Sequence, residues 1–142
     1  MTTAPQRITL ALTGASGMPY GLRLLECLLA AEKTVWLIVS QAAHIVIATE
    51  CEFTLPAQPR AAQALLAERY RAKEGQLEVF GREDWMAPVA SGSNPADAMV
   101  VCPCSMGTLA ALAQGLADNT MERAADGMRK KRRPLVRVRR EQ

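Results

Sequence analysis

Short apolar runs alternate with longer amphipathic stretches along most of this chain. The first apolar run, residues 8–12, is followed by Leu22, Leu25 and Leu29, which recur with the spacing of one helix face. A second run, residues 34–39, is rich in the β-branched and aromatic residues typical of strands. This alternation predicts an α/β fold with a parallel sheet covered by helices on both faces.

Later segments continue the same alternation. Further helices are predicted at residues 41–50, 61–72 and 106–115, and one more follows Asn119. Further strands are predicted at residues 77–80, 98–101 and 134–138. A chain of 142 residues with 49% hydrophobic content is expected to form one domain, residues 1–142.

The turn after the first apolar run contains Gly14, Ser16, Gly17 and Gly21. Glycines allow a tight turn and the close approach of a ligand, and the helix start that follows favours an anion. The stretch therefore predicts a strand, a phosphate loop and a helix, although a turn without a ligand fits these residues equally well. The glycine spacing fits neither the dinucleotide fingerprint nor the P-loop, which favours a mononucleotide over nicotinamide cofactors.

Hydroxyl side chains stand where other apolar runs meet helices. Ser40 follows the second run, and Ser105 and Thr108 open a later helix. Such residues either cap their helix or contact a ligand at the carboxyl edge of the sheet, and both interpretations stay open here. Two of these helix starts can converge on one ligand. Asn119 and Glu122 have the spacing of a capping box for another helix.

The formal net charge of +3 conceals an uneven distribution. Eight basic residues follow residue 128, with Glu141 the only acid there, so the tail carries about +7 and the rest about −4. The eight are Arg129, Lys130, Lys131, Arg132, Arg133, Arg137, Arg139 and Arg140. This tail could contact nucleic acid or form a solvated helix end leading to a phosphate-facing strand. The lack of interleaved aromatics disfavours a single-strand binder and the acidic rest of the chain would repel a duplex, so nucleic acid is not the expected partner.

Two candidate metal or redox groups are weak. Cys102 and Cys104 flank Pro103 at a strand end, where both are expected to point the same way and to lack partner ligands, so we expect free thiols. His44 has no carboxylate or cysteine at a useful spacing in its predicted helix, and we expect it at the surface or half-buried.

No apolar run is long enough to span a membrane, and residues 1–7 lack the apolar core of a signal peptide. A cytosolic location is therefore expected.

Several motifs occur in a fixed order: TGASGMPYG, Ser40, DWMAPVASGS, CPCSMGTLA, ERAAD and KKRRPLV. In this order they resemble the UbiX-type flavin prenyltransferases, within a wider flavoprotein family that includes cysteine decarboxylases. The resemblance covers residues 7–141. It implies a three-layer, Rossmann-like and flavodoxin-related fold that binds FMN at a subunit interface of a large homo-oligomer.

The resemblance also implies an activity. Proteins of this type join a dimethylallyl group from dimethylallyl phosphate to reduced FMN, and they need no metal. The product, prenylated FMN, is the cofactor of a UbiD-type decarboxylase that acts on unsaturated or aromatic acids, as in ubiquinone biosynthesis.

Site residues follow from the same resemblance, position by position. FMN contacts are implied at Gly14, Ala15, Ser16, Ser40, Ala90, Ser105, Met106, Gly107, Thr108, Arg123 and Arg140. Catalytic roles are implied for Ser16, Trp85, Lys130 and Glu141. The hydroxyl of Ser16 would lie near the reactive flavin nitrogen, and Trp85 would wall the prenyl group.

These roles agree with the chemistry of prenyl transfer. Cations such as Lys130 neutralise the charge that develops on a leaving phosphate, and an aromatic face shelters an allylic cation. A carboxylate such as Glu141 can assist the movement of a proton.

Two features depart from the family pattern. Family chains continue beyond the position of Glu141 with a helix, a strand and a terminal helix that supply a tyrosine and an arginine for the prenyl phosphate. Arg137 and Arg139 replace apolar and proline positions, and a charge in a central parallel strand is costly unless it is paired. Two alternatives therefore stay open: an inactive FMN-binding or assembly subunit, and a flavin-dependent cysteine decarboxylase, which the lack of a histidine near Trp85 disfavours.

Overall fold

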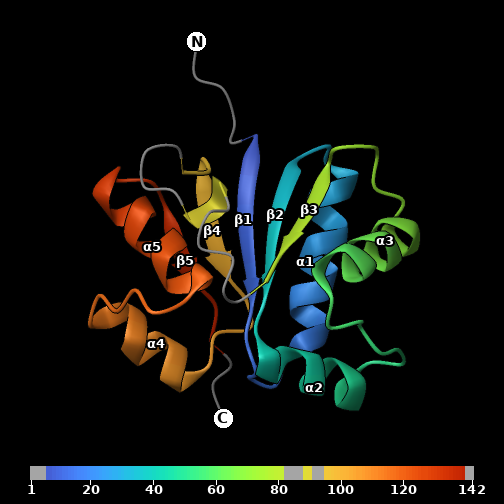
Figure 1. The fold of residues 1–142 in the computed structure, drawn as a ribbon, viewed down its shortest axis with the longest axis horizontal. Helices are drawn as coiled ribbons and strands as arrows, with labels where there is room; N and C mark the ends of the chain where they lie inside the picture. Colours follow the sequence, from blue (N-terminus) through green and yellow to red (C-terminus); the bar gives the residue numbers. More distant parts are fainter. Residues whose placement is uncertain (1–5, 82–87, 91–94, 140–142) are drawn as a thin grey trace.

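A computed structural model of the chain describes residues 6–81, 88–90 and 95–139. Five parallel strands form one sheet in the order β3-β2-β1-β4-β5 (Figure 1). They are β1 (Arg7–Leu12), β2 (Thr34–Val39), β3 (Leu77–Phe80), β4 (Ala98–Val101) and β5 (Leu135–Arg137). Within the described ranges, no helix is long and apolar enough to cross a membrane.

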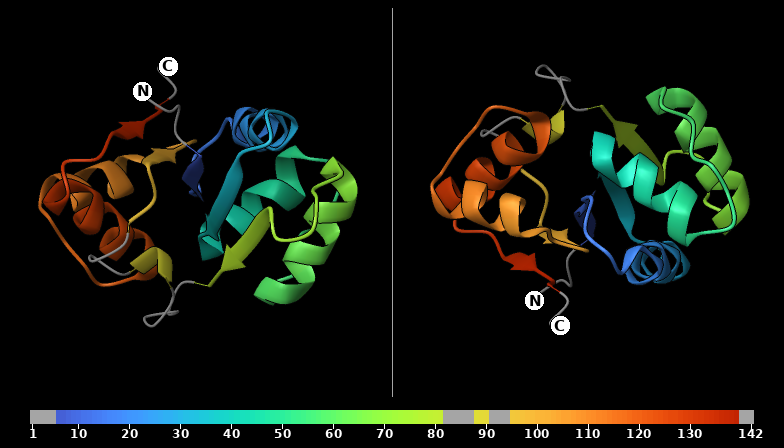
Figure 2. Two further views of the ribbon diagram at one scale, coloured as in Figure 1. Left: turned by 90° about the horizontal axis from the view of Figure 1, so that it is seen from above. Right: turned by 90° about the horizontal axis from the view of Figure 1, so that it is seen from below.

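Helices cover both faces of this sheet, as the end-on views in Figure 2 show. They are α1 (Met18–Ala30), α2 (Gln41–Glu50), α3 (Pro59–Tyr70), α4 (Met106–Ala113) and α5 (Thr120–Lys130), with a short 3-10 helix, η1 (Pro88–Ala90). The predicted α/β, three-layer, Rossmann-like architecture is therefore confirmed, with the helices and strands close to the positions expected from the apolar pattern.

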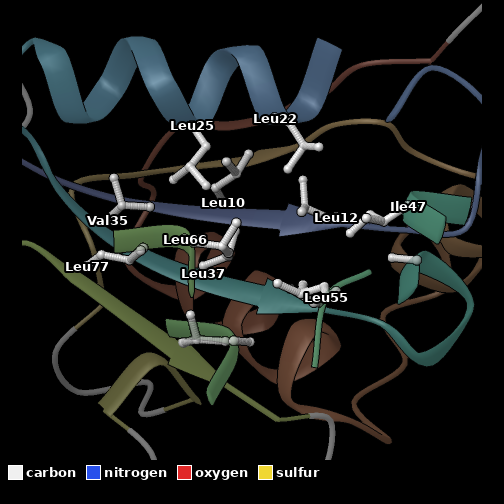
Figure 3. Packing of buried hydrophobic residues seen from close by; sticks show 14 of the residues in the cluster. Leu10, Leu12, Leu22, Leu25, Val35, Leu37, Ile47, Leu55, Leu66 and Leu77 are labelled. Carbon is white, nitrogen blue, oxygen red and sulfur yellow. The ribbon is translucent and has the colours of Figure 1, made fainter. Parts of the chain in front are cut away.

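The strand alternation of β1 creates one apolar cluster on each face of the sheet. Leu10 and Leu12 face α1, where Leu22 and Leu25 pack on them (Figure 3). Ala11 points to the opposite face and joins the cluster formed with α4 and α5. All five side chains are at most 5% exposed, so β1 is buried on both faces as its continuous apolar run predicted.

Helix α1 begins at Met18, a little before the position expected from the leucine pattern. Gly17 precedes it with φ +97°, a left-handed conformation that side chains rarely adopt, and a proline occupies the first turn. Gly21 lies inside the helix. The close packing requires glycine at this position, because a Cβ would overlap the carbonyl oxygen of Cys102. The turn after β1 is therefore shorter than predicted, and α1 packs closely on the end of β4.

The strand order places a topological switch between β1 and β4. From β1 the chain moves outward through β2 to β3, then returns to the other side of β1 for β4 and β5 (Figure 1). The connections leaving β1 and β4 therefore part in opposite directions at the carboxyl edge of the sheet. In open α/β sheets this is where ligands bind.

One expectation about the cysteines is wrong. Cys102 joins the apolar cluster that contains α1, whereas Cys104 joins the cluster that contains α5. They point apart because β4 ends at Val101 and Pro103 interrupts the strand alternation. Both are free thiols, as expected, and burial raises the pKa of each thiol.

Arg137 and Arg139 do not disrupt the last strand. β5 pairs in register with β4, Arg137 opposite Val101, and Val138 continues the backbone pairing with a 2.8 Å hydrogen bond to Val101. β5 lies at one edge of the described sheet, and both arginine side chains are exposed. The expected cost of burying these charges is therefore not incurred in this structure.

Asp97 ties together the starts of three strands at the amino edge of the sheet. Its Oδ2 accepts hydrogen bonds from the backbone N–H groups of Gln6 and Arg7, each at 3.0 Å. Its Oδ1 forms an ion pair with Arg133 at 3.2 Å. The N–H of Arg7 is the main cause that lowers the pKa of Asp97, with smaller contributions from Gln6 and Arg133.

Stability should therefore depend on the charge of Asp97. Because its pKa is lower in the folded state, the carboxylate stabilises the fold at neutral pH, and this contribution is lost as the pH falls through the folded pKa. Asp97→Asn should lower the free energy of unfolding at pH 7 by about 1 kcal/mol, reduced from the usual value for charged hydrogen bonds by solvent exposure. Denaturant titrations at pH 7 and at acid pH measure this difference, which should shrink at low pH. Glu74→Gln removes the same charge from an exposed residue and serves as the control; equal losses for the two variants would contradict the role of Asp97.

Candidate functional site

A cavity of about 430 Å³ opens at the carboxyl edge of the sheet, beside the switch between β1 and β4. Thr13 and Gly14 follow β1 along one part of its lining. The rest comes largely from the starts of α2, α4 and α5, which include Ser40, Ser105 and Asn119. Three helix starts thus meet at one cavity.

Serine hydroxyls cap two of these helices. Ser40 Oγ accepts a 3.1 Å hydrogen bond from the backbone N–H of Ala43 at the start of α2. Ser105 Oγ accepts a 3.1 Å hydrogen bond from the N–H of Thr108 and donates to its Oγ1 at 2.9 Å. The capping interpretation is confirmed for both serines, which also line the cavity. The first N–H groups of these helices lack partners within the helix and remain suited to an anion.

A carboxylate accepts hydrogen bonds at the third helix start, that of α5. Glu122, 9% exposed, donates its backbone N–H to Asn119 Oδ1 at 2.8 Å, which confirms the predicted capping pair. Its Oε1 accepts from the N–H of Asp118 at 2.9 Å, and its Oε2 accepts from Asn119 Nδ2 at 3.1 Å. This buried negative charge lines the cavity beside α5. An anionic ligand is therefore favoured near α2 and α4 rather than near α5.

Two glycines of the lining serve different purposes. A Cβ on Gly14 would stand 2.4 Å from Ala42 Cβ, so the absence of a side chain lets the β1 turn pack on the start of α2. A Cβ on Gly107 would have no atom within 4 Å. Packing does not require glycine at position 107, where the open backbone leaves room for a ligand to approach α4.

The start of α1 already has a negative partner. Glu50 Oε1, at the end of α2, accepts hydrogen bonds from the N–H groups of Gly17 at 3.2 Å and Met18 at 3.0 Å. The anion that the glycine-rich turn predicted at this helix start is thus the protein's own carboxylate. Ser16 is exposed and lines a separate cavity of about 260 Å³ together with Tyr20 and Arg139.

The structure brings together part of the predicted site. Gly14, Ser40, Ser105, Gly107 and Thr108 all line the larger cavity. The other described candidates do not line it; they are Ala15, Ser16, Ala90, Met106, Arg123 and Lys130. The predicted residues Trp85, Arg140 and Glu141 lie outside the described residues.

The basic candidates lie on α5. Lys130 is exposed and forms a 3.0 Å ion pair with Asp126, and Arg123 is exposed on the same helix. His44 is half-buried, as expected, with Nδ1 3.2 Å from the carbonyl oxygen of Leu55. Across residues 6–81, 88–90 and 95–139, no cluster of histidine, cysteine or acidic residues is suited to a metal ion.

The sequence patterns do not predict the roles of three residues at the carboxyl edge of the sheet: Thr13, Ala42 and Glu50. Thr13 and Ala42 line the cavity, and Glu50 caps α1 from another helix. For Thr13, the one signal in the sequence is a hydroxyl at the end of a strand rather than at the start of a helix. Glu50 had no local signal because its partners lie far away along the chain.

The sequence profile described as Flavoprotein matches residues 2–138. The chain belongs to the flavoprotein family. It is 58% identical to the flavin prenyltransferase UbiX of Pseudomonas aeruginosa, over 98% of this chain and 66% of that protein. It is 42% identical to the protein of the same name from Alkalihalophilus pseudofirmus, over 94% of this chain and 65% of that protein. The chain thus spans just under two thirds of the length of these curated relatives.

Solved structures of the family share this fold. AnUbiX (PadA1), in complex with FMN and dimethylallyl pyrophosphate, matches with a TM-score of 0.80 and 38% identity over 97% of this chain and 66% of that chain. A dodecameric FMN-dependent UbiX-like decarboxylase from Escherichia coli O157:H7 matches with a TM-score of 0.79 and 34% identity, over 95% of this chain and 67% of that chain.

The contact between Gly14 and Ala42 can be tested by exchanging the two residues. Gly14→Ala should lower the free energy of unfolding by about 1–3 kcal/mol, because the added methyl group overlaps that of Ala42. Ala42→Gly in the same chain should restore part of this loss, since it removes the nearest overlapping atom. Denaturant titrations of the two single variants and the double variant measure the coupling.

Gly107→Ala is the matched control, because its methyl group meets no atom within 4 Å. It should leave the stability unchanged or raise it slightly. Additive effects of Gly14→Ala and Ala42→Gly would contradict the proposed packing.

Proposed function

We propose that this chain forms the FMN site of a flavin prenyltransferase, which joins a dimethylallyl group from dimethylallyl phosphate to reduced FMN. The 58% identity to a UbiX enzyme and the similarity to a structure holding FMN and dimethylallyl pyrophosphate support this activity. The observation that carries it is the cavity at the β1–β4 switch, which is lined by the starts of α2 and α4 and where the backbone of α4 is open at Gly107.

The cavity suits FMN in its distribution of charge. A phosphate near Ser40 and Ser105 would receive backbone N–H groups from α2 and α4. The Glu122 carboxylate would repel a phosphate at the α5 end but accept hydrogen bonds from neutral hydroxyl groups such as those of a ribityl chain. FMN, with one phosphate and several hydroxyls, matches this arrangement. The implied contacts at Gly14, Ala15, Met106, Gly107 and Thr108 belong to this proposal.

The transfer chemistry needs cations, an aromatic wall and a proton acceptor. Bound FMN supplies the nucleophilic flavin atoms. We assign Lys130, Arg123 and Arg140 to the prenyl phosphate and FMN phosphate, where fixed positive charge favours departure of the leaving group. Lys130 must exchange its ion pair with Asp126 to do this.

The remaining assignments follow the family positions. Trp85 and Ala90 would line the prenyl group, Ser16 would hydrogen-bond the flavin, and Glu141 would assist proton movement.

The wider context is part of the same proposal. We expect one domain over residues 1–142, assembled as a homo-oligomer with FMN at a subunit interface, and the dodecameric relative supports assembly. Prenylated FMN would pass to a UbiD-type decarboxylase, and the enzyme would work in the cytosol, in the route to ubiquinone or in aromatic acid metabolism. The tyrosine and arginine that family chains place beyond the position of Glu141 would complete the prenyl-phosphate site.

FMN binding should depend on the open backbone at Gly107. Gly107→Leu should weaken FMN binding about tenfold or more by filling the space beside α4. We expect the fold to remain intact, because no atom lies within 4 Å of the new Cβ and the rest of the side chain can extend into the open cavity. Ala110→Leu adds the same side chain at an exposed position of α4 outside the cavity and should bind FMN normally. Flavin fluorescence titration measures both affinities; equal binding by the two variants would exclude the cavity as the FMN site.

Transfer activity is tested directly with reduced FMN and dimethylallyl phosphate under anaerobic conditions. Mass spectrometry of the extracted flavin should show FMN heavier by one prenyl unit. Bound FMN without this product would favour the non-catalytic FMN-binding or assembly subunit. Loss of CO₂ from a peptide with a terminal cysteine would favour the decarboxylase alternative.

Ser16→Ala should slow prenyl transfer while retaining FMN, if its hydroxyl contacts the flavin.

A further inference from the structure

The backbone pairing between β1 and β4 is interrupted beside the cavity. The N–H of Cys102 donates to the carbonyl of Ala11 at 2.9 Å, but the N–H of Cys104, two residues later, donates to Val138 on the β5 side at 2.8 Å instead of to β1. On the β1 side the carbonyl of Pro103 is left with one long backbone hydrogen bond, from the N–H of Thr13 at 3.3 Å, and the N–H of Ser105 has no strand partner. Buried backbone groups of this kind need replacement hydrogen bonds.

The side chain of Thr13 provides these replacements. Its Oγ1 donates to the carbonyl of Pro103 at 2.5 Å and accepts from the N–H of Ser105 at 2.9 Å. Its own backbone N–H also donates to Pro103, at 3.3 Å. The residue is 1% exposed, so water does not readily substitute for this hydroxyl. Thr13 therefore links the end of β1 to the residue that caps α4.

Thr13 and its neighbour contact both helix starts that we assign to the phosphate. Through Ser105, Thr13 holds the start of α4, while Gly14 packs against Ala42 in the first turn of α2. All four of these residues line the cavity. Because two consecutive residues of one chain make these contacts, they set the separation between the two helix starts.

We infer that Thr13 is a positioning residue for the flavin phosphate, acting through Ser105 on the start of α4. This inference rests on the proposed FMN site. The hydroxyl itself is already committed to Pro103 and Ser105, so its effect on the ligand is indirect. The spacing of the N–H groups that receive the phosphate depends on it, and small displacements of such donors weaken binding.

The test compares three variants of the full chain. Thr13→Val keeps the shape of the side chain but removes both hydrogen bonds, and it should weaken FMN binding about tenfold. Thr13→Ser keeps the hydroxyl and should bind within about twofold of the unchanged chain. Thr9→Val makes the same substitution at a residue of β1 that is also 1% exposed but lies outside the cavity, and it should leave FMN affinity unchanged.

Two measurements are made on each variant: FMN affinity by fluorescence titration, and hydrogen exchange of the Ser105 amide in flavin-free protein. Thr13→Val should accelerate this exchange, and Thr13→Ser and Thr9→Val should not. If Thr13→Val does not fold, Thr13→Ala takes its place, because the vacated space can admit a water molecule to the orphaned groups. A folded Thr13→Val or Thr13→Ala that binds FMN as tightly as Thr9→Val would overturn the inference.

The exchange measurement separates this inference from the proposed function. If the unchanged chain fails to bind FMN, the proposed function is wrong, and the FMN affinities of the variants cannot be compared. Faster Ser105 exchange in Thr13→Val alone would still support control of the α4 start by Thr13. Equal exchange in all variants would refute that control whether or not FMN binds.

Discussion

Hydrogen bonding of the backbone where β1 and β4 part is the constraint on which this carboxyl edge depends. Parallel strands whose connections leave in opposite directions create a crevice, but they also end a ladder of backbone hydrogen bonds inside the protein. Here the regular pairing of β4 with β1 ends at Cys102. The hydroxyl and the N–H of Thr13 both donate to the carbonyl of Pro103, and the hydroxyl accepts from the N–H of Ser105. A short side chain thus links the end of β1 to the residue that caps α4, beside the crevice.

Helix caps then decide where negative charge is accepted. Among the described residues, α1 and α5 begin beside the carboxylates of Glu50 and Glu122, whereas α2 and α4 begin at Ser40 and Ser105. A carboxylate satisfies the N–H groups and also opposes the helix dipole, so such a start no longer attracts an anion. A serine satisfies one N–H but adds no charge. The two serine-capped starts consequently remain the electropositive part of the cavity.

Local patterns in the sequence predicted most of this arrangement. Strand and helix positions, the capping pair Asn119–Glu122 and the cap at Ser40 all depend on residues within one or two turns of one another, where spacing alone carries the information. The contact of Glu50, at the end of α2, with the start of α1 and the opposed directions of Cys102 and Cys104 depend on how separate elements pack together. Gly14 shows the limit most clearly. Its place in a glycine-rich turn suggested a ligand contact, but the structure gives it a second reason, the close approach of Ala42.

The last strand shows why the cost of a charged residue depends on solvent access rather than on membership in a sheet. Pairing of β5 with β4 uses only backbone groups, which Arg137 supplies as well as an apolar residue would. The half-buried Leu135 packs on the apolar cluster formed with α4 and α5, and this contact anchors the strand. Arg137 and Arg139 extend into solvent from the edge of the described sheet, where their charges remain hydrated. Arg139 also reaches the smaller cavity that contains Ser16. The two arginines therefore leave the strand intact, and Arg139 places a positive charge at the cavity that also contains Ser16, a proposed catalytic residue.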